Sequence, residues 1–185
     1  MAASSCAYYN TFYLARKYYF KATDGAPYLV ERQGGAQAQN FTRAIDYSKK
    51  VLGNYPNSKW VDDAYLMWAQ GLIGREDPLQ TITMLQDFST RFPKSDQKAE
   101  AQFFLALAFR QARKYPQAVS AFDDFLAQSP KNDLVPYAHY ERSRALMSLQ
   151  RYADAAVAAG QVLERFPRHT LADRALRQRA EARFQ

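Results

Sequence analysis

Apolar residues follow a helical period through most of the chain. The clearest stretch has two blocks of apolar residues at helical spacing, which meet at Lys114. Such spacing places the apolar side chains on one face of each of two helices. The two blocks are Phe103, Leu105, Ala108 and Phe109, then Tyr115, Ala118, Phe122 and Phe125.

A proline recurs every 37 residues, at Pro56, Pro93, Pro130 and Pro167. An alanine stands eight residues after each proline, and a small residue (Gly71, Ala108, Ala145, Ala182) stands fifteen after it. The chain is therefore predicted to be a repeat of helix pairs. One pair cannot bury its own apolar face, and stacked neighbours bury it jointly.

The predicted helix boundaries follow from the prolines, because the residue before a proline disfavours helical conformation. Ser58, Ser95 and Asn132, two residues after a proline, are predicted N-caps. One long loop is predicted over 23–38, which holds three of the seven glycines and Pro27. Helices are predicted near 8–22, 39–54, 58–73, 78–91, 95–113, 115–128, 133–149, 152–165 and 169–183.

Composition and charge narrow the class of protein. The chain has 185 residues, 48% of them hydrophobic, which is enough for one domain or a short repeat array. Its longest clear apolar run, 103–109, is well short of the roughly 18 residues that span a bilayer. The net charge of +7 concentrates at the two ends. Because it is not gathered with aromatic residues in a known module, a nucleic-acid partner is disfavoured.

The residues that carry catalytic or metal chemistry are sparse. His139 and His169 lie thirty residues apart with no further ligand at metal spacing. The adjacent pairs Asp62–Asp63 and Asp123–Asp124 point in divergent directions on a helix. No enzyme activity, cofactor or metal site is predicted.

The run Ala99–Phe109, followed by Tyr115-Pro-Gln-Ala118 and closed by Pro130, resembles a tetratricopeptide repeat. The resemblance covers 39–185, with 37 rather than 34 residues per unit. The motifs Tyr-Pro-Asn-Ser at 55–58 and Phe-Pro-Lys-Ser at 92–95 are similar to those of BamD-like outer-membrane assembly lipoproteins and of Tol-Pal periplasmic coordinators. The resemblance implies an all-α, right-handed superhelical stack of helix-turn-helix repeats, here one domain over 8–185.

The resemblance also implies a partner-binding groove, because the first helix of each tetratricopeptide unit lines the concave side. The groove would be mixed in charge at first and basic towards the C-terminus, which suits a protein segment with acidic and apolar residues. In the alternative interpretation, Phe103 and Tyr140 pack against neighbouring repeats. The implied groove residues are Asp63, Leu66, Gln70, Glu100, Phe103, Leu107, Arg110, Tyr137, Tyr140, Arg144, Met147, Arg174 and Arg177.

The segment 1–7 resembles the end of a lipoprotein signal, in which small residues precede a cysteine that becomes lipidated. Only five residues precede Cys6, and they include neither a charged nor an apolar region, so the chain as written could not be exported by that route. We expect a truncated or mis-assigned start and a lipid anchor on Cys6. The alternative is an ordinary thiol.

The stretch 7–20 is unusually aromatic, with seven Tyr or Phe among fourteen residues. It is interpreted as the first helix of repeat one, packing on the helix at 39–54 and covering the open end of the stack. The alternative is a membrane-interface or partner-binding helix, in which Arg16, Lys17 and Lys21 meet anionic headgroups.

Three functions are carried forward. The first is a non-enzymatic scaffold on the periplasmic face of a bacterial outer membrane, acting in β-barrel protein assembly. The second is a soluble Tol-Pal-type coordinator, disfavoured because the chain has no heptad run. The third is a nucleic-acid-binding helical repeat. The array ends with the first helix of a fifth unit, which places the family's C-terminal partner contacts in doubt.

Overall fold

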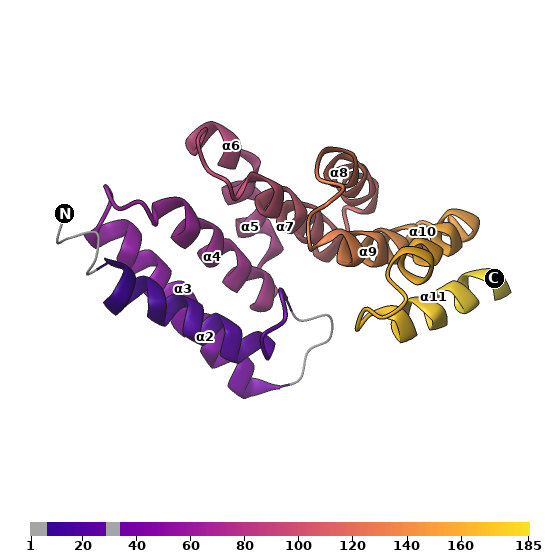
Figure 1. The fold of residues 1–185 in the computed structure, drawn as a ribbon, viewed down its shortest axis with the longest axis horizontal. Helices are drawn as coiled ribbons and strands as arrows, with labels where there is room; N and C mark the ends of the chain where they lie inside the picture. Colours follow the sequence, from indigo (N-terminus) through magenta and orange to yellow (C-terminus); the bar gives the residue numbers. More distant parts are fainter. Residues whose placement is uncertain (1–6, 29–33) are drawn as a thin grey trace. The chain divides into compact units, whose positions relative to one another are not determined.

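The computed structural model describes residues 7–28 and 34–185, with side chains from Asn10 onward, and the secondary structure in these ranges is helical (Figure 1). The chain forms two compact units, Met1–Phe104 and Leu105–Gln185, with the boundary inside α7. The elements are the π-helix η1 (Ala7–Phe12), then α2 (Tyr13–Thr23), α3 (Gly35–Asn54), α4 (Val61–Gly74), α5 (Pro78–Gln86), α6 (Phe88–Arg91), α7 (Lys98–Gln111), α8 (Tyr115–Gln128), α9 (Val135–Ser148), α10 (Tyr152–Arg165) and α11 (Ala172–Phe184).

Within each unit, helices pack on their neighbours in sequence. In the first unit, η1 and α2 pack on α3, α3 packs on α4, and α4 packs on α5. In the second unit, α8 packs on α9, α9 on α10, and α10 on α11. Consecutive packing of this kind is typical of repeat arrays, in which each unit buries the apolar face of the next.

The aromatic N-terminal helix uses one face to build the core of the first unit. Phe12 and Tyr19 are buried there with Phe41 of α3, and the Tyr19 and Phe41 rings meet edge to face with centroids 5.8 Å apart. Tyr18 stacks on Tyr47 at 5.7 Å. The predicted packing of this helix on the helix at 39–54 is therefore confirmed.

The second unit combines fully buried rings with alanines. Phe122, Phe125 and Leu146 have no exposed surface, and neither do Ala138 and Ala145 of α9. Small residues allow helices to approach closely, and the large residues fill the space between them. The alanines that recur along the sequence thus mark the helix-to-helix contacts.

The turn before the first helix of each unit is built in the same way four times. A side chain two residues after the proline accepts a hydrogen bond from the backbone N–H two residues further on: Ser58 from Trp60 (3.3 Å), Ser95 from Gln97 (3.1 Å), Asn132 from Leu134 (2.9 Å) and His169 from Leu171 (3.2 Å). The three predicted N-caps therefore cap this turn, and α4, α7, α9 and α11 begin later than predicted, at Val61, Lys98, Val135 and Ala172.

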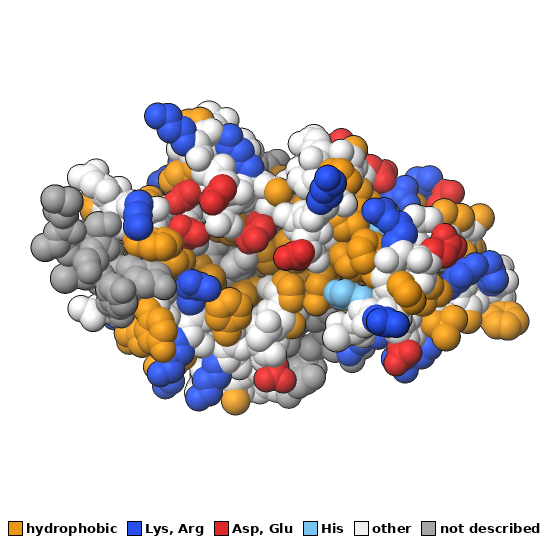
Figure 2. All heavy atoms as spheres, in the orientation of Figure 1, with side chains coloured by type: hydrophobic (Ala, Val, Ile, Leu, Met, Phe, Trp, Pro, Cys, Tyr) orange, Lys and Arg blue, Asp and Glu red, His pale blue; other side chains and the backbone are white. Residues whose placement is uncertain are grey.

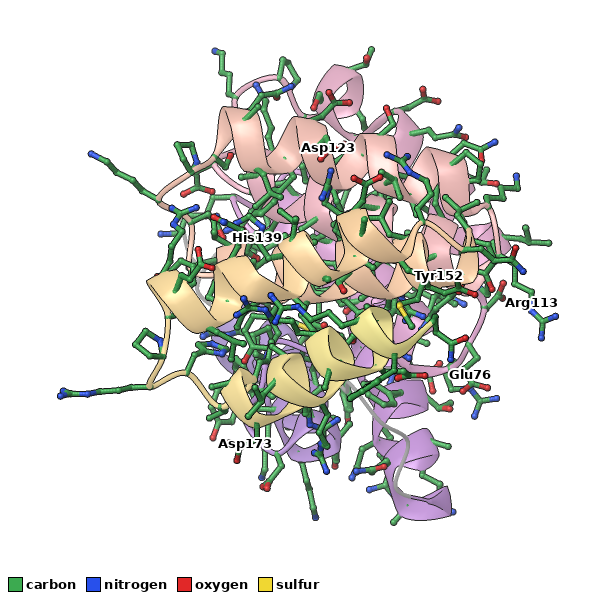
Figure 3. The ribbon with its side chains drawn as sticks, turned by 90° about the vertical axis from the view of Figure 1, so that its right-hand side faces the viewer. Glu76, Arg113, Asp123, His139, Tyr152 and Asp173 are labelled. Atoms are coloured by element: carbon green, nitrogen blue, oxygen red, sulfur yellow. The ribbon has the colours of Figure 1, made fainter. Side chains whose placement is uncertain are left out.

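The turn that follows the first helix also repeats every 37 residues. Glu76, Arg113 and Gln150 each have φ of +59°, in the left-handed region. The next residue donates its N–H to a carbonyl five positions back, for example Lys114 to Phe109 at 2.9 Å. This is the 6→1 hydrogen bond that closes many helix C-termini, usually with glycine in the left-handed position. Figure 3 shows Glu76 and Arg113.

Two further predictions, the loop at 23–38 and the continuous helix at 78–91, are wrong. The predicted loop at 23–38 is shorter, because Thr23 ends α2 and α3 already begins at Gly35. Gly34 turns the chain into α3 with φ of +128°, and 36–38 are good helix formers. The predicted helix at 78–91 is interrupted at Asp87, where the chain redirects Phe88 into the core.

Candidate partner-binding faces

The predicted groove residues divide into buried and accessible side chains. Five are buried: Leu66, Gln70, Phe103, Leu107 and Tyr140. Their side chains are covered by other parts of the fold. The accessible or half-buried ones are Asp63 and Glu100 in the first unit and Arg110, Tyr137, Arg144, Met147, Arg174 and Arg177 in the second. Partner binding by these residues stays a prediction.

Asp63 of α4 is the centre of an acidic face in the first unit. Its Oδ1 accepts a hydrogen bond from Gln97 Nε2 at 3.2 Å. Burial raises the pKa of Asp63 to about 6, with further contributions from the carboxylates of Asp62, Asp96 and Glu100, which Arg16 of α2 partly offsets. Helices α2, α4 and α7 thus contribute to one face, where acidic side chains gather (Figure 2).

Phe103, a predicted groove residue, is covered by the segment that follows α2. Its ring meets that of Tyr28, which is 3% exposed, with centroids 5.7 Å apart. The Tyr19 hydroxyl donates a hydrogen bond to the Pro27 carbonyl, and burial raises the pKa of Tyr19, so this donor stays protonated. The sequence gives no periodic signal for Tyr28, because it lies outside the helices.

Glu141 of α9 is the centre of the corresponding region in the second unit. Its carboxylate is completely buried, and Arg110 Nε lies 2.5 Å from one oxygen and Arg144 Nη1 lies 3.1 Å from the other. The two arginines were predicted to make this part of the groove basic. Because Glu141 offsets one of their two charges, the three side chains together carry one net positive charge. Our sequence reasoning missed Glu141, although its repeat phase matches the buried residues Met67 and Phe104.

Two ring contacts hold predicted groove residues of α9 in place. The Arg144 guanidinium lies 5.8 Å from the centre of the Tyr140 ring. The Tyr137 ring meets that of His169 edge to face at 4.9 Å. Arg144 is therefore engaged by both Tyr140 and Glu141, and substituting it would disturb the fold as well as the surface.

Buried polar contacts connect α9 to both α10 and α11. Ser143 Oγ donates to the Ala155 carbonyl at 2.8 Å and accepts from Gln178 Nε2 at 3.0 Å. Because each partner is buried and satisfied, these hydrogen bonds favour one relative placement of the three helices. The side chains on α9 are thus presented from a rigid support.

His139 lies on the side of α9 that faces α10 and approaches Arg165 Nη1 at 3.4 Å (Figure 3). Burial, together with the nearby Arg165 and Arg142, lowers its pKa to about 4. A neutral ring nitrogen can accept a hydrogen bond from the guanidinium, whereas an imidazolium cannot. His139 is therefore a neutral structural residue at pH 7.

Among the residues with described positions, no group of three or more His, Cys, Asp or Glu side chains is arranged to hold a metal ion. Cys6, the predicted lipidation site, lies outside the described residues. None of the helices in the described part of the chain combines the length and apolarity needed to cross a bilayer.

Comparison with known proteins supports the repeat interpretation. The YfiO family model, described as an outer membrane lipoprotein, matches residues 68–156, from α4 into α10. A solved structure of a Podospora anserina protein described as a putative kinesin light chain, with nearly identical TPR-like repeats, superposes with a TM-score of 0.68. The match covers 98% of this chain and 86% of that one, at 15% sequence identity. No curated protein matches the sequence. The predicted fold class, an all-α array of tetratricopeptide-type helix pairs, is confirmed.

Proposed function

We propose that this protein is a non-enzymatic scaffold that binds another protein at the periplasmic face of a bacterial outer membrane, in the assembly of β-barrel outer-membrane proteins. The observation that carries the proposal is the match of residues 68–156 to a family of outer membrane lipoproteins, on a fold of stacked helix pairs. A lipid on Cys6, within the segment 1–7, would supply the membrane anchor.

The second unit offers the more suitable partner-binding face. Tyr137 and Met147 are half-buried, and Arg177 is exposed, on helices fixed by buried hydrogen bonds. Aromatic, Met and Arg side chains bury large areas at interfaces with modest ordering cost. Arg110 and Arg144 together carry one more charge than Glu141 offsets. This surface therefore suits an extended protein segment that carries acidic and apolar residues.

The test is affinity purification of the tagged chain from bacterial outer membranes, followed by identification of the bound proteins. The binding variant combines Met147→Ser with Arg177→Glu, because neither side chain is embedded like Tyr140 or Arg144. The matched control combines Val157→Ser with Arg168→Glu, which changes an exposed apolar residue and an exposed arginine elsewhere in the second unit.

We expect the wild type and the control to retain a β-barrel assembly component and the binding variant to lose it, with unchanged circular dichroism. Equal recovery by all three proteins would rule out this face. Recovery of Tol-Pal components instead would identify a periplasmic coordinator. Recovery of nucleic acid, with salt-dependent binding to a generic oligonucleotide, would identify the helical repeat as a nucleic-acid binder.

A further inference from the structure

The outward side of α2 carries two aromatic rings and two lysines. Tyr13 is 52% exposed and Phe20 is 41% exposed, and Lys17 and Lys21 are exposed as well. At 100° per residue, these four side chains lie within an arc of about 100°. We call them the α2 outer face.

The α2 outer face is separate from the side of the helix that builds the core. Ala15, Tyr19 and Ala22 are buried against α3, on the opposite side of α2. The aromatic content of the helix thus divides between two roles: one set of rings fills the first unit, and the other is presented to the surroundings. The Phe20 ring meets the buried Tyr19 ring edge to face at 6.2 Å, yet both Phe20 and Tyr13 stay exposed.

The charges around the α2 outer face have one predominant sign. Lys17 and Lys21 lie on it, and Arg16 lies at its edge with its guanidinium 5.6 Å from the centre of the Phe20 ring. The one acidic residue of 13–24 is Asp24, which stands at the C-cap. The helix therefore presents apolar rings within a cationic border.

We infer that the α2 outer face lies against an anionic lipid surface. Tyr and Phe rings partition into the boundary between headgroups and acyl chains, while neighbouring lysines interact with anionic headgroups. A stable protein partner would need about 800 Å² of complementary surface on this side, and two exposed rings supply only part of that area. A lipid surface requires no such complementarity.

The inference does not rest on the proposed groove, and the Cys6→Ser background removes any contribution from an acyl chain. In this background, co-sedimentation of the full chain is measured with vesicles of phosphatidylcholine containing about 30% phosphatidylglycerol, and with pure phosphatidylcholine vesicles. We expect binding to the anionic vesicles that weakens as salt is raised, because the lysine contribution is screened.

Two variants test the face. Lys17→Gln with Lys21→Gln should lower the partition coefficient about 30-fold, because each cation contributes about 1 kcal/mol near an anionic surface. Phe20→Ser should lower it about tenfold through loss of apolar contact. The matched controls, Lys114→Gln with Lys131→Gln and Leu79→Ser, change exposed residues of the same kind elsewhere and should bind like the Cys6→Ser parent.

Absence of binding to the anionic vesicles would overturn the inference, as would equal losses in the α2 and control variants. Equal binding to neutral and anionic vesicles would also overturn it, because the lysines would then have no role. If the α2 variants lost an envelope protein in affinity purification while vesicle binding was unchanged, the face would be a protein interface and the lipid inference would be wrong.

Discussion

Replacing Gly74 by alanine tests whether a close approach of α4 and α3 organises the first unit. A Cβ atom at Gly74 would lie 2.4 to 2.5 Å from three ring atoms of Phe41. Carbon atoms in contact normally lie about 3.5–4.0 Å apart, so the ring must move by about 1 Å. Phe41 is 2% exposed and packs against Tyr19, which leaves the ring little room to move.

We expect Gly74→Ala to destabilise the first unit by about 1–3 kcal/mol, the usual cost of overpacking a core. Gly71→Ala should also destabilise the first unit, because its Cβ would lie 2.6 Å from Ile45 Cγ1. The preference of alanine for the helix, up to about 1 kcal/mol, offsets part of that cost. Gly53→Ala is the matched control. No atom lies within 4 Å of its added Cβ, so we expect a stabilisation of about 0.5–1 kcal/mol.

The measurement is urea unfolding followed by tryptophan fluorescence. Both tryptophans of the chain, Trp60 and Trp68, lie in the first unit, so the signal reports on that unit alone. A double variant of Gly74→Ala with Phe41→Leu should be more stable than the sum of the single effects predicts, because the smaller side chain makes room for the Cβ. The reasoning is refuted if Gly74→Ala is as stable as Gly53→Ala, or if the two substitutions are additive.

Four further predictions concern single positions. Arg113→Gly should stabilise the second unit by about 1 kcal/mol in urea unfolding followed by far-UV circular dichroism, because glycine adopts φ of +59° without strain; destabilisation would contradict the assigned left-handed turn. Asp63→Asn should stabilise the first unit by about 1–2 kcal/mol at pH 7 and have little effect near pH 4, because a carboxyl whose pKa is raised to about 6 contributes stability that is lost as the pH rises through 6. A change in the free energy of unfolding that does not depend on pH would disprove the burial argument. The second unit should lose up to about 3 kcal/mol of its free energy of unfolding between pH 6.5 and pH 4, since the unfolded state binds a proton at His139 that the folded state, in which the pKa of His139 is about 4, excludes. An NMR titration of His139 in the folded state with a midpoint near 6.5 would contradict this. Glu141→Ala should cost about 3–5 kcal/mol in urea unfolding, because it leaves Arg110 without its buried partner, and an unchanged midpoint would show that the ion pair is dispensable.

The repeat, the helix pairs and most of the helix boundaries could be predicted from the sequence. A proline every 37 residues and alanines at fixed offsets carry this information locally, because each helix buries a face defined by its own period. Packing of the aromatic N-terminal helix on the next helix was predictable for the same reason. Asp63 was also placed on the first helix of its unit, but its raised pKa comes mainly from burial in the fold, with smaller contributions from Asp62, Asp96 and Glu100.

Several features had no local signal. Arg113 adopts a left-handed turn without glycine, because the 6→1 hydrogen bond and helix packing compensate for the backbone cost. His169 takes the turn position that serine or asparagine occupies in the other units. The interruption at Asp87 is set by the burial of Phe88, which depends on contacts between helices.

The candidate surfaces show most clearly which features follow from the sequence and which depend on the tertiary structure. By itself, the sequence determined which helices come first in each unit and which residue types they carry, because helical period and repeat phase are properties of neighbouring residues. Only the tertiary structure decided that Tyr28 covers Phe103, that Glu141 neutralises one of two arginines, and that Tyr13 and Phe20 stay outside the core. These outcomes depend on residues brought together by folding, whose distances and exposure no local pattern encodes.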